Sequence, residues 1–239
     1  VLALIRSKGG YRLEIKKLRF SFSAFKPIVR IGIPAGIQSS MFSISNVIIQ
    51  SSINSFGAMV MAGNTAAMSI ESFLCTSLDA VNQSSIACVS QNMGAKEPER
   101  VKKAVRYCLA IECIIAVVMG ALMNIFGEQL LGIYTDEEAA IAAGLSRLFI
   151  MGATFFMNGM QHMMGGVMRS IGYSILPTIV SLFGICGFRI LWIFLFFAGH
   201  HSIEAIYISY PISWTITFAV HMICYLTLRK RKFAQLQTS

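Results

Sequence analysis

The sequence predicts an all-α integral membrane protein with six transmembrane helices. Of its 239 residues, 55% are hydrophobic and only 13% are charged, which is about half the charged fraction of an ordinary soluble domain. Six apolar stretches are each long enough to cross a hydrocarbon core of roughly 30 Å. Basic connections alternate along the chain with connections that lack Lys and Arg. Together these observations argue against a soluble domain, a disordered chain and a disulfide-stapled secreted module.

Short connections separate the predicted spans. We place the spans, in chain order, at 28–54, 58–91, 104–126, 140–168, 173–198 and 203–228. Their length and uniformly apolar character favour helices over the strands of a β-barrel, which alternate in hydropathy. The second stretch is longer than a span requires, and we expect it to tilt or to extend beyond the bilayer.

The basic residues predict the orientation in the membrane. Eighteen of the 20 Lys and Arg residues fall in four places on one side of six alternating spans: 1–30, 92–107, Arg169 and 229–232. No Lys or Arg occurs in the connections on the other side, 55–57, 127–139 and 199–202. Because cytoplasmic connections carry the excess of Lys and Arg, both termini of this segment are predicted to be cytoplasmic, in a multi-pass protein of the cell membrane. The net charge of +9 thus reflects topology, and no nucleic-acid partner is expected.

One face of the first span is polar. Its polar residues follow at steps of four, three, four and four, which places them on one side of a helix: Ser39, Ser43, Asn46, Gln50 and Asn54. In a bilayer such a face has to meet protein or water. Two interpretations remain open, namely hydrogen bonds that join neighbouring helices and the wall of an aqueous cavity. For the second, the candidate substrate-cavity residues are Gln38, Ser39, Ser43, Asn46, Gln50, Asn64, Asn82, Asn158 and Gln161.

The second span contains two carboxylates, Glu71 and Asp79. Each is either paired with Arg189 or another buried donor, or holds a coupling ion, since a carboxylate inside a membrane is a functional candidate. A desolvated carboxyl group can hold a proton or exchange it for a cation. Both residues are therefore candidates for a coupling-ion or proton site.

Ionisable residues in the later spans are expected to be structural. Glu112 lies about two turns into the third span and is expected to be structural or interfacial. Arg147 lies near the outer end of the fourth span, and we expect its side chain to extend outward to the interface. Arg189 lies deep in the fifth span and is predicted to be a structural buried charge, in an ion pair or at a helix end. His162 is expected to be a packing residue rather than a proton carrier.

Signatures of enzymes are missing from the sequence. It contains no phosphate-binding glycine loop, no nucleophile elbow and no H-E-x-x-H motif. The six Cys residues fall inside predicted spans without a C-x-x-C pair, and the adjacent His200 and His201 are a weak metal signal. We therefore expect no enzymatic activity, no metal site and no cofactor beyond a coupling Na⁺ or H⁺.

An ordered set of motifs resembles the second half of the multidrug and toxic compound extrusion (MATE) family. The motifs are RIGIPAGIQSS (30–40), INSFG (53–57), AAMSIESF (66–73), VSQNMGAKEPERVKKA (89–104), RSIGYSILP (169–177) and YPISW (210–214). The resemblance implies one lobe of a twelve-helix, two-lobe transporter that exchanges Na⁺ or H⁺ for a small organic compound by alternating access. The implied partners are the lipid bilayer and an N-terminal six-helix lobe of the same polypeptide.

The resemblance also divides the chain into three parts. It implies the end of a preceding span plus a basic cytoplasmic linker at 1–27, a six-helix C-terminal lobe at 28–228, and a basic cytoplasmic tail at 229–239. Some branches of the family carry cation-site carboxylates in the seventh and tenth spans, which here are 28–54 and 140–168 and have no membrane-embedded Asp or Glu. The coupling site is therefore either Glu71 or outside this half. Two other functions stay open, a related flippase for lipid-linked sugars and a membrane assembly subunit that transports nothing.

Overall fold

The computed structural model describes residues 5, 19–197, 199 and 202–238. The predicted end of a preceding span and most of the basic linker lie outside the described residues, as do His200 and His201. All regular structure in the described part is helical, so the all-α prediction is confirmed.

Six long helical segments coincide with the six predicted spans. They are α2 (Phe22–Asn54), α3 (Ala58–Gly94), α4 (Pro98–Ile125), α6 (Glu138–Ser170), a continuous segment formed by α7 (Ile175–Ser181), η2 (Leu182–Gly187), α8 (Phe188–Trp192) and η3 (Ile193–Phe197), and α9 (Ile203–Thr238). The η2 and η3 stretches are π-helical. The short α5 (Gly127–Gly132) connects α4 to α6.

The helices extend beyond the apolar stretches that marked them in the sequence. α2 begins at Phe22 and α4 at Pro98, six residues before the predicted starts of their spans. α9 continues through the basic residues 229–232. Hydropathy marks only the apolar part of a helix, whereas the backbone hydrogen bonds continue into its charged ends.

The composition of the helices fits a multi-pass membrane protein. Among the described residues, α4, α6, the segment Ile175–Phe197 and the Ile203–Ala234 part of α9 are long and apolar enough to cross a membrane. α2 and α3 have 33 and 37 residues and carry the predicted polar faces. Large apolar side chains such as Ile114 and Phe194 are exposed on outward faces, where lipid would cover them.

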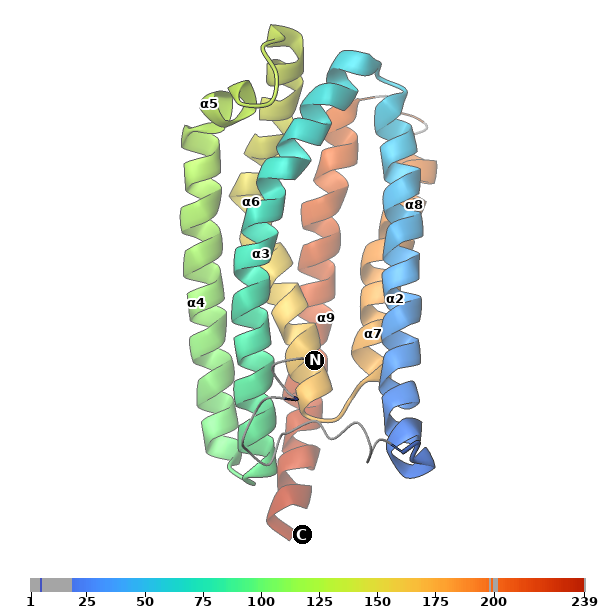
Figure 1. Ribbon diagram of the computed structural model, residues 1–239, viewed down its shortest axis with the longest axis vertical. Coiled ribbons are helices and arrows are strands. Elements are labelled where there is room, and N and C mark those ends of the chain that lie inside the picture. The colour runs from blue at the N-terminus through green and yellow to red at the C-terminus, as the bar shows by residue number, and fades with distance from the viewer. Residues whose placement is uncertain (1–4, 6–18, 198, 200–201, 239) are drawn as a thin grey trace.

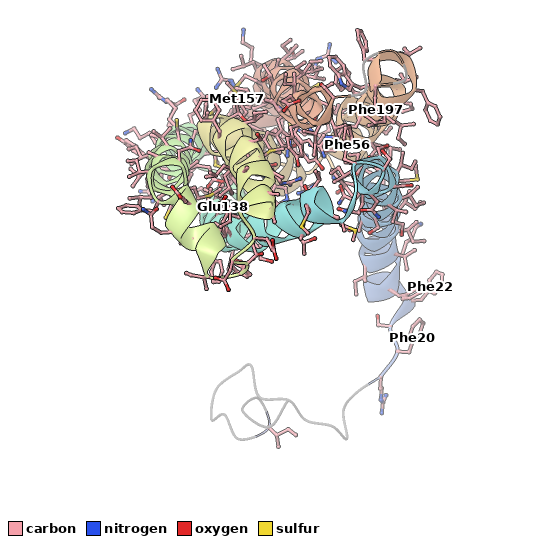
Figure 2. The ribbon with its side chains drawn as sticks, turned by 90° about the horizontal axis from the view of Figure 1, so that it is seen from above. Phe20, Phe22, Phe56, Glu138, Met157 and Phe197 are labelled. Carbon is pink, nitrogen blue, oxygen red and sulfur yellow. The ribbon has the colours of Figure 1, made fainter. Side chains whose placement is uncertain are left out.

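The segments run alternately up and down the bundle, with α5 at the end opposite to the C-terminus (Figure 1). α6 packs against α3, α4 and α9, and α2 lies beside the α7–η2–α8 segment (Figure 1). Figure 2 shows Phe56, after α2, close to Phe197 at the end of η3, and their ring centroids are 5.9 Å apart. This aromatic contact joins the two peripheral segments at the α5 end.

Glycines allow the central helices to approach closely. A Cβ atom added to Gly63 of α3 would collide with the carbonyl oxygen of Ala140 on α6, and one added to Gly120 of α4 would collide with that of Gly152. Small residues that bring backbones together are a common way to pack helices in lipid, where apolar burial provides little driving force. The position of α6 against α3 and α4 thus depends on these backbone contacts.

Candidate functional site

A cavity of about 600 Å³ lies between α2, α3, α6 and α7. Its walls combine amide, hydroxyl and charged groups with a few apolar side chains. The lining residues are Gln38, Ser39, Phe42, Cys75, Leu78, Asp79, Asn158, Gly159, Gln161, His162, Gly165, Arg169 and Ser181. Its volume falls within the roughly 300–1,000 Å³ typical of small-molecule sites.

Five of the predicted site residues meet in this cavity. Gln38 and Ser39 come from α2, Asp79 from α3, and Asn158 and Gln161 from α6. The Gln161 Nε2 amide donates to Asn158 Oδ1 at 3.3 Å, so these two side chains orient each other. Candidate residues from three predicted spans thus line one cavity.

Asp79 has a titratable neighbour in the cavity. Its Oδ1 oxygen lies 3.3 Å from Nδ1 of His162, and the Asn82 side-chain amide lies 3.4 Å from the same nitrogen. A ring nitrogen that carries hydrogen donates, and one without hydrogen accepts. Nδ1 can therefore donate to Asp79 or accept from Asn82, but it cannot do both at once. His162, which the sequence suggested to be a packing residue, is half-exposed here.

The remaining residues of the polar face of α2 lie away from this cavity. Ser43 is exposed and donates to the backbone carbonyl of Ser39, and Asn46 is exposed. Gln50 donates to Asn54 Oδ1 at 2.8 Å and accepts from Asn64 Nδ2 at 3.3 Å. Gln50 therefore joins α2 to α3, which is the hydrogen-bonding interpretation of the polar face.

Glu71 is paired with a residue that the sequence did not suggest. Nε and Nη2 of Arg147 each donate to one Glu71 oxygen at 2.7 Å, and Nη1 donates to Asn64 Oδ1 at 2.9 Å. The Arg147 guanidinium also lies 5.5 Å from the ring centroids of Tyr207 and Tyr210. The expectation that Arg147 extends outward is wrong. Its side chain is buried, because Glu71 compensates its charge within the bundle.

Arg189 is buried among aromatic rings. Its guanidinium lies 4.0 Å from the ring centroid of Tyr210 and 5.6 Å from that of Trp214, and Nε donates to Ser213 Oγ at 3.0 Å. Rings of this kind attract a cation through their negative faces. The sequence left an ion pair or a helix-end position open for Arg189; among the described residues its partners are these rings and the Ser213 hydroxyl.

One sequence signal was available for the Glu71–Arg147 pair. Glu71 lies 13 residues into α3 and Arg147 nine residues into α6, and both helices begin at the same end of the bundle. At 1.5 Å per residue their depths are about 20 and 14 Å, close enough for two long side chains to meet. No comparable signal indicated Tyr207, Tyr210 or Trp214.

The cavity presents groups that can interact with a small polar or charged molecule. The described residues contain no group of three His, Cys, Asp or Glu side chains that could hold a metal ion. The cavity instead offers the Asp79–His162 pair and several neutral amides. These groups can neutralise a positive charge and donate or accept hydrogen bonds.

Comparison with known proteins gives a consistent result. A sequence model described as MatE matches residues 34–195. The probable multidrug resistance protein YoeA of Bacillus subtilis is 23% identical over 193 residues, which is 80% of this chain and 41% of YoeA. The multidrug resistance protein PmpM of Pseudomonas aeruginosa is 26% identical over 166 residues, or 67% of this chain and 34% of PmpM. The chain spans less than half of the length of these relatives.

Solved structures share the fold at low sequence identity. A crystal structure of MATE in complex with MaL6 matches with a TM-score of 0.83 and 16% identity, covering 99% of this chain and 53% of that one. A MOP superfamily transporter from Pyrococcus furiosus matches with a TM-score of 0.81 and 16% identity, covering 95% and 50%. The fold is thus that of about half of these transporters.

Proposed function

The chain belongs to the MatE family, and from this premise we propose that it forms one six-helix half of a cation-coupled multidrug efflux antiporter. The exported compounds are amphipathic, cationic organic molecules. The observation that carries this proposal is the cavity of about 600 Å³, which presents Asp79 and several amides to its interior. Polar groups within a membrane segment are costly unless they face protein or water, so a polar hollow of this size supports a binding role.

Asp79, rather than Glu71, is the proposed coupling carboxylate of this half. Both Glu71 oxygens accept hydrogen bonds from Arg147, so an ion would have to displace a buried guanidinium. Asp79 is exposed to the cavity, and among the described residues His162 is its one titratable partner within 4 Å. The adjacent imidazole favours H⁺ over Na⁺, because it supplies a proton-binding nitrogen where a hard cation prefers oxygen.

Transport requires a second half. The relatives and solved structures are about twice as long as this chain, and we propose that a second six-helix lobe closes the cavity from the other side. Ion and compound would then drive alternating access by binding one orientation more tightly than the other. The basic helix ends would lie in the cytoplasm, and the protein would carry out no enzymatic reaction.

The flippase alternative receives less support from the structure. It requires cationic side chains in a groove for a pyrophosphate, and the sequence offered Arg147 and Arg189 for this role. Arg147 is instead occupied by Glu71, and Arg189 is enclosed by aromatic rings. Arg169 is the one arginine that lines the cavity, within the described part of the chain.

The test is efflux by the full-length protein in everted membrane vesicles. Ethidium should be transported when a proton gradient is imposed, and Asp79→Asn should abolish the gradient-driven part at normal expression. Glu99→Gln is the matched control, because Glu99 is exposed near the start of α4 and pairs with Lys102 on the surface. Wild-type transport by Asp79→Asn would remove Asp79 from the mechanism. Movement of a lipid-linked sugar in place of ethidium would favour the flippase, and transport of neither would favour the assembly subunit.

A further inference from the structure

Glu112 is a buried carboxyl group that the proposed function does not use. It is residue 15 of the 28-residue α4, so it lies at the middle of that helix; the sequence suggested a structural or interfacial role for it. Its side chain is 1% exposed. Neither carboxyl oxygen has a hydrogen-bond partner among the described residues.

The carboxyl group of Glu112 lies directly behind the cavity wall. A Cβ atom added to Gly159 of α6 would be 2.7 Å from Glu112 Oε1 and 3.2 Å from Leu78 Cδ1 of α3. Gly159 and Leu78 both line the cavity. Because Gly159 has no side chain, the Glu112 carboxyl group can lie against the backbone of this cavity-lining residue.

The titratable groups around Glu112 are few. α3 contributes Asp79, whose charge acts on Glu112, and α4 itself contributes Cys108. α6 contributes His162, which faces Asp79. An ionised Glu112 would be a second negative charge next to Asp79. Among these groups, a protonated His162 is the one cation that could compensate it.

The free-energy cost of burying a charge determines whether the Glu112 carboxyl group carries a proton. An ionised carboxylate that is buried without a partner is far more costly than the neutral acid, and such groups in practice take up a proton. A nearby negative charge on Asp79 has the same effect. A bound metal cation would need several oxygen ligands, and no suitable cluster exists among the described side chains.

We propose that Glu112 is a second proton-holding site of the transporter, loaded in the state described here. The inference rests on the proposed function. When a cationic compound occupies the cavity, its positive charge supplies the compensation that an ionised Glu112 lacks. The O–H bond of Glu112 then breaks and its proton passes to water in the cavity. The compound brings one positive charge and the proton removes one, so the charge inside the lobe is unchanged. Asp79 and Glu112 would thus link binding of the compound to release of H⁺.

The first test does not depend on transport. Infrared spectra of the purified full-length protein without any compound should show a protonated-carboxyl C=O band that Glu112→Gln lacks. Glu99→Gln, a control on the same helix, should retain it. Glu112→Asp keeps the carboxyl group but withdraws it by one methylene, so it should shift the band. An unchanged band in both Glu112 variants would overturn the proposal, and the Asp variant decides the matter if the Gln variant does not fold.

The second test measures release of protons on binding of ethidium in weakly buffered detergent solution with a pH indicator. Wild type and Glu99→Gln should release protons, and Glu112→Gln should release roughly one fewer per ethidium bound, as linkage requires. Equal release by Glu112→Gln and wild type would overturn the proposed role. If wild-type vesicles move no ethidium, the proposed function fails, whereas the infrared band still decides whether Glu112 holds a proton.

Discussion

Replacing Glu71 with Gln should destabilise the lobe through the arginine that it leaves behind. Glu71 accepts two hydrogen bonds of 2.7 Å from Arg147, and the side chains are 10% and 3% exposed. In Glu71→Gln the amide keeps an acceptor oxygen but removes the negative charge. The Arg147 guanidinium then stays buried with only neutral partners, Asn64 and two tyrosine rings.

The expected magnitude follows from this burial. Breaking a buried ion pair by removing one partner costs about 3–5 kcal/mol. In a domain of this size, 1 kcal/mol lowers the melting temperature by roughly 2–4 °C, so the loss should be on the order of 10 °C. Glu71→Leu combined with Arg147→Met removes both charges and should recover most of this loss, because no uncompensated charge remains.

The assay is thermal unfolding of the full-length protein in detergent, followed by size-exclusion chromatography with fluorescence detection. A double-mutant cycle separates the coupling between the two side chains from their individual effects. Lys102→Met is a suitable control, because the Lys102–Glu99 pair is on the surface and should contribute little. The reasoning would be refuted if Glu71→Gln melted with the wild type, or if the double variant lost as much as the sum of the single changes.

Three further changes test other contacts. Gly120→Ala should cost about 1–3 kcal/mol by overpacking and lower the melting temperature, because the added Cβ meets a carbonyl oxygen of α6. In the control Gly32→Ala the added Cβ has no atom within 4 Å, so this variant should melt as the wild type. Equal melting temperatures of the two variants would contradict the packing. Cys75 lines the cavity and should react with a water-soluble methanethiosulfonate, and bound ethidium should slow this reaction. The buried Cys186 should not react. An unreactive Cys75 would indicate a dry cavity. His162→Gln should weaken the pH dependence of ethidium efflux, because it removes the titratable neighbour of Asp79, and an unchanged profile would contradict a role for this pair.

The fold was predictable because each span can be identified from its own stretch of sequence. A run of apolar residues marks a membrane helix, and the positions of Lys and Arg mark alternate connections, so neither requires knowledge of neighbours in space. The ends were less predictable. Pro98 and Phe22 begin helices among charged residues, where hydropathy gives no signal. The π-helical stretches at Leu182–Gly187 and Ile193–Phe197 have no recognised sequence signature.

The sequence predicted which site residues share one face of a helix, but not which residues of different helices contact each other. A helical period shows that Asn158 and Gln161 share a side, and the structure places both in the cavity. It does not show which helix lies opposite. For this reason the sequence did not identify the partner of Glu71. It also assigned Arg147 to the membrane interface, although Arg147 pairs with Glu71.

The glycine contacts of α6 determine which parts of this half are able to move. With backbone pressed on backbone at Gly63 and Gly120, sliding of α3 or α4 along α6 would drive carbonyl oxygens into neighbouring chain atoms. We therefore expect these three helices to move together. Bending is left to the segment Ile175–Phe197, whose wider turns at η2 and η3 interrupt the regular ladder. The wall of the cavity to which Ser181 belongs is then the one that we expect to change shape most easily.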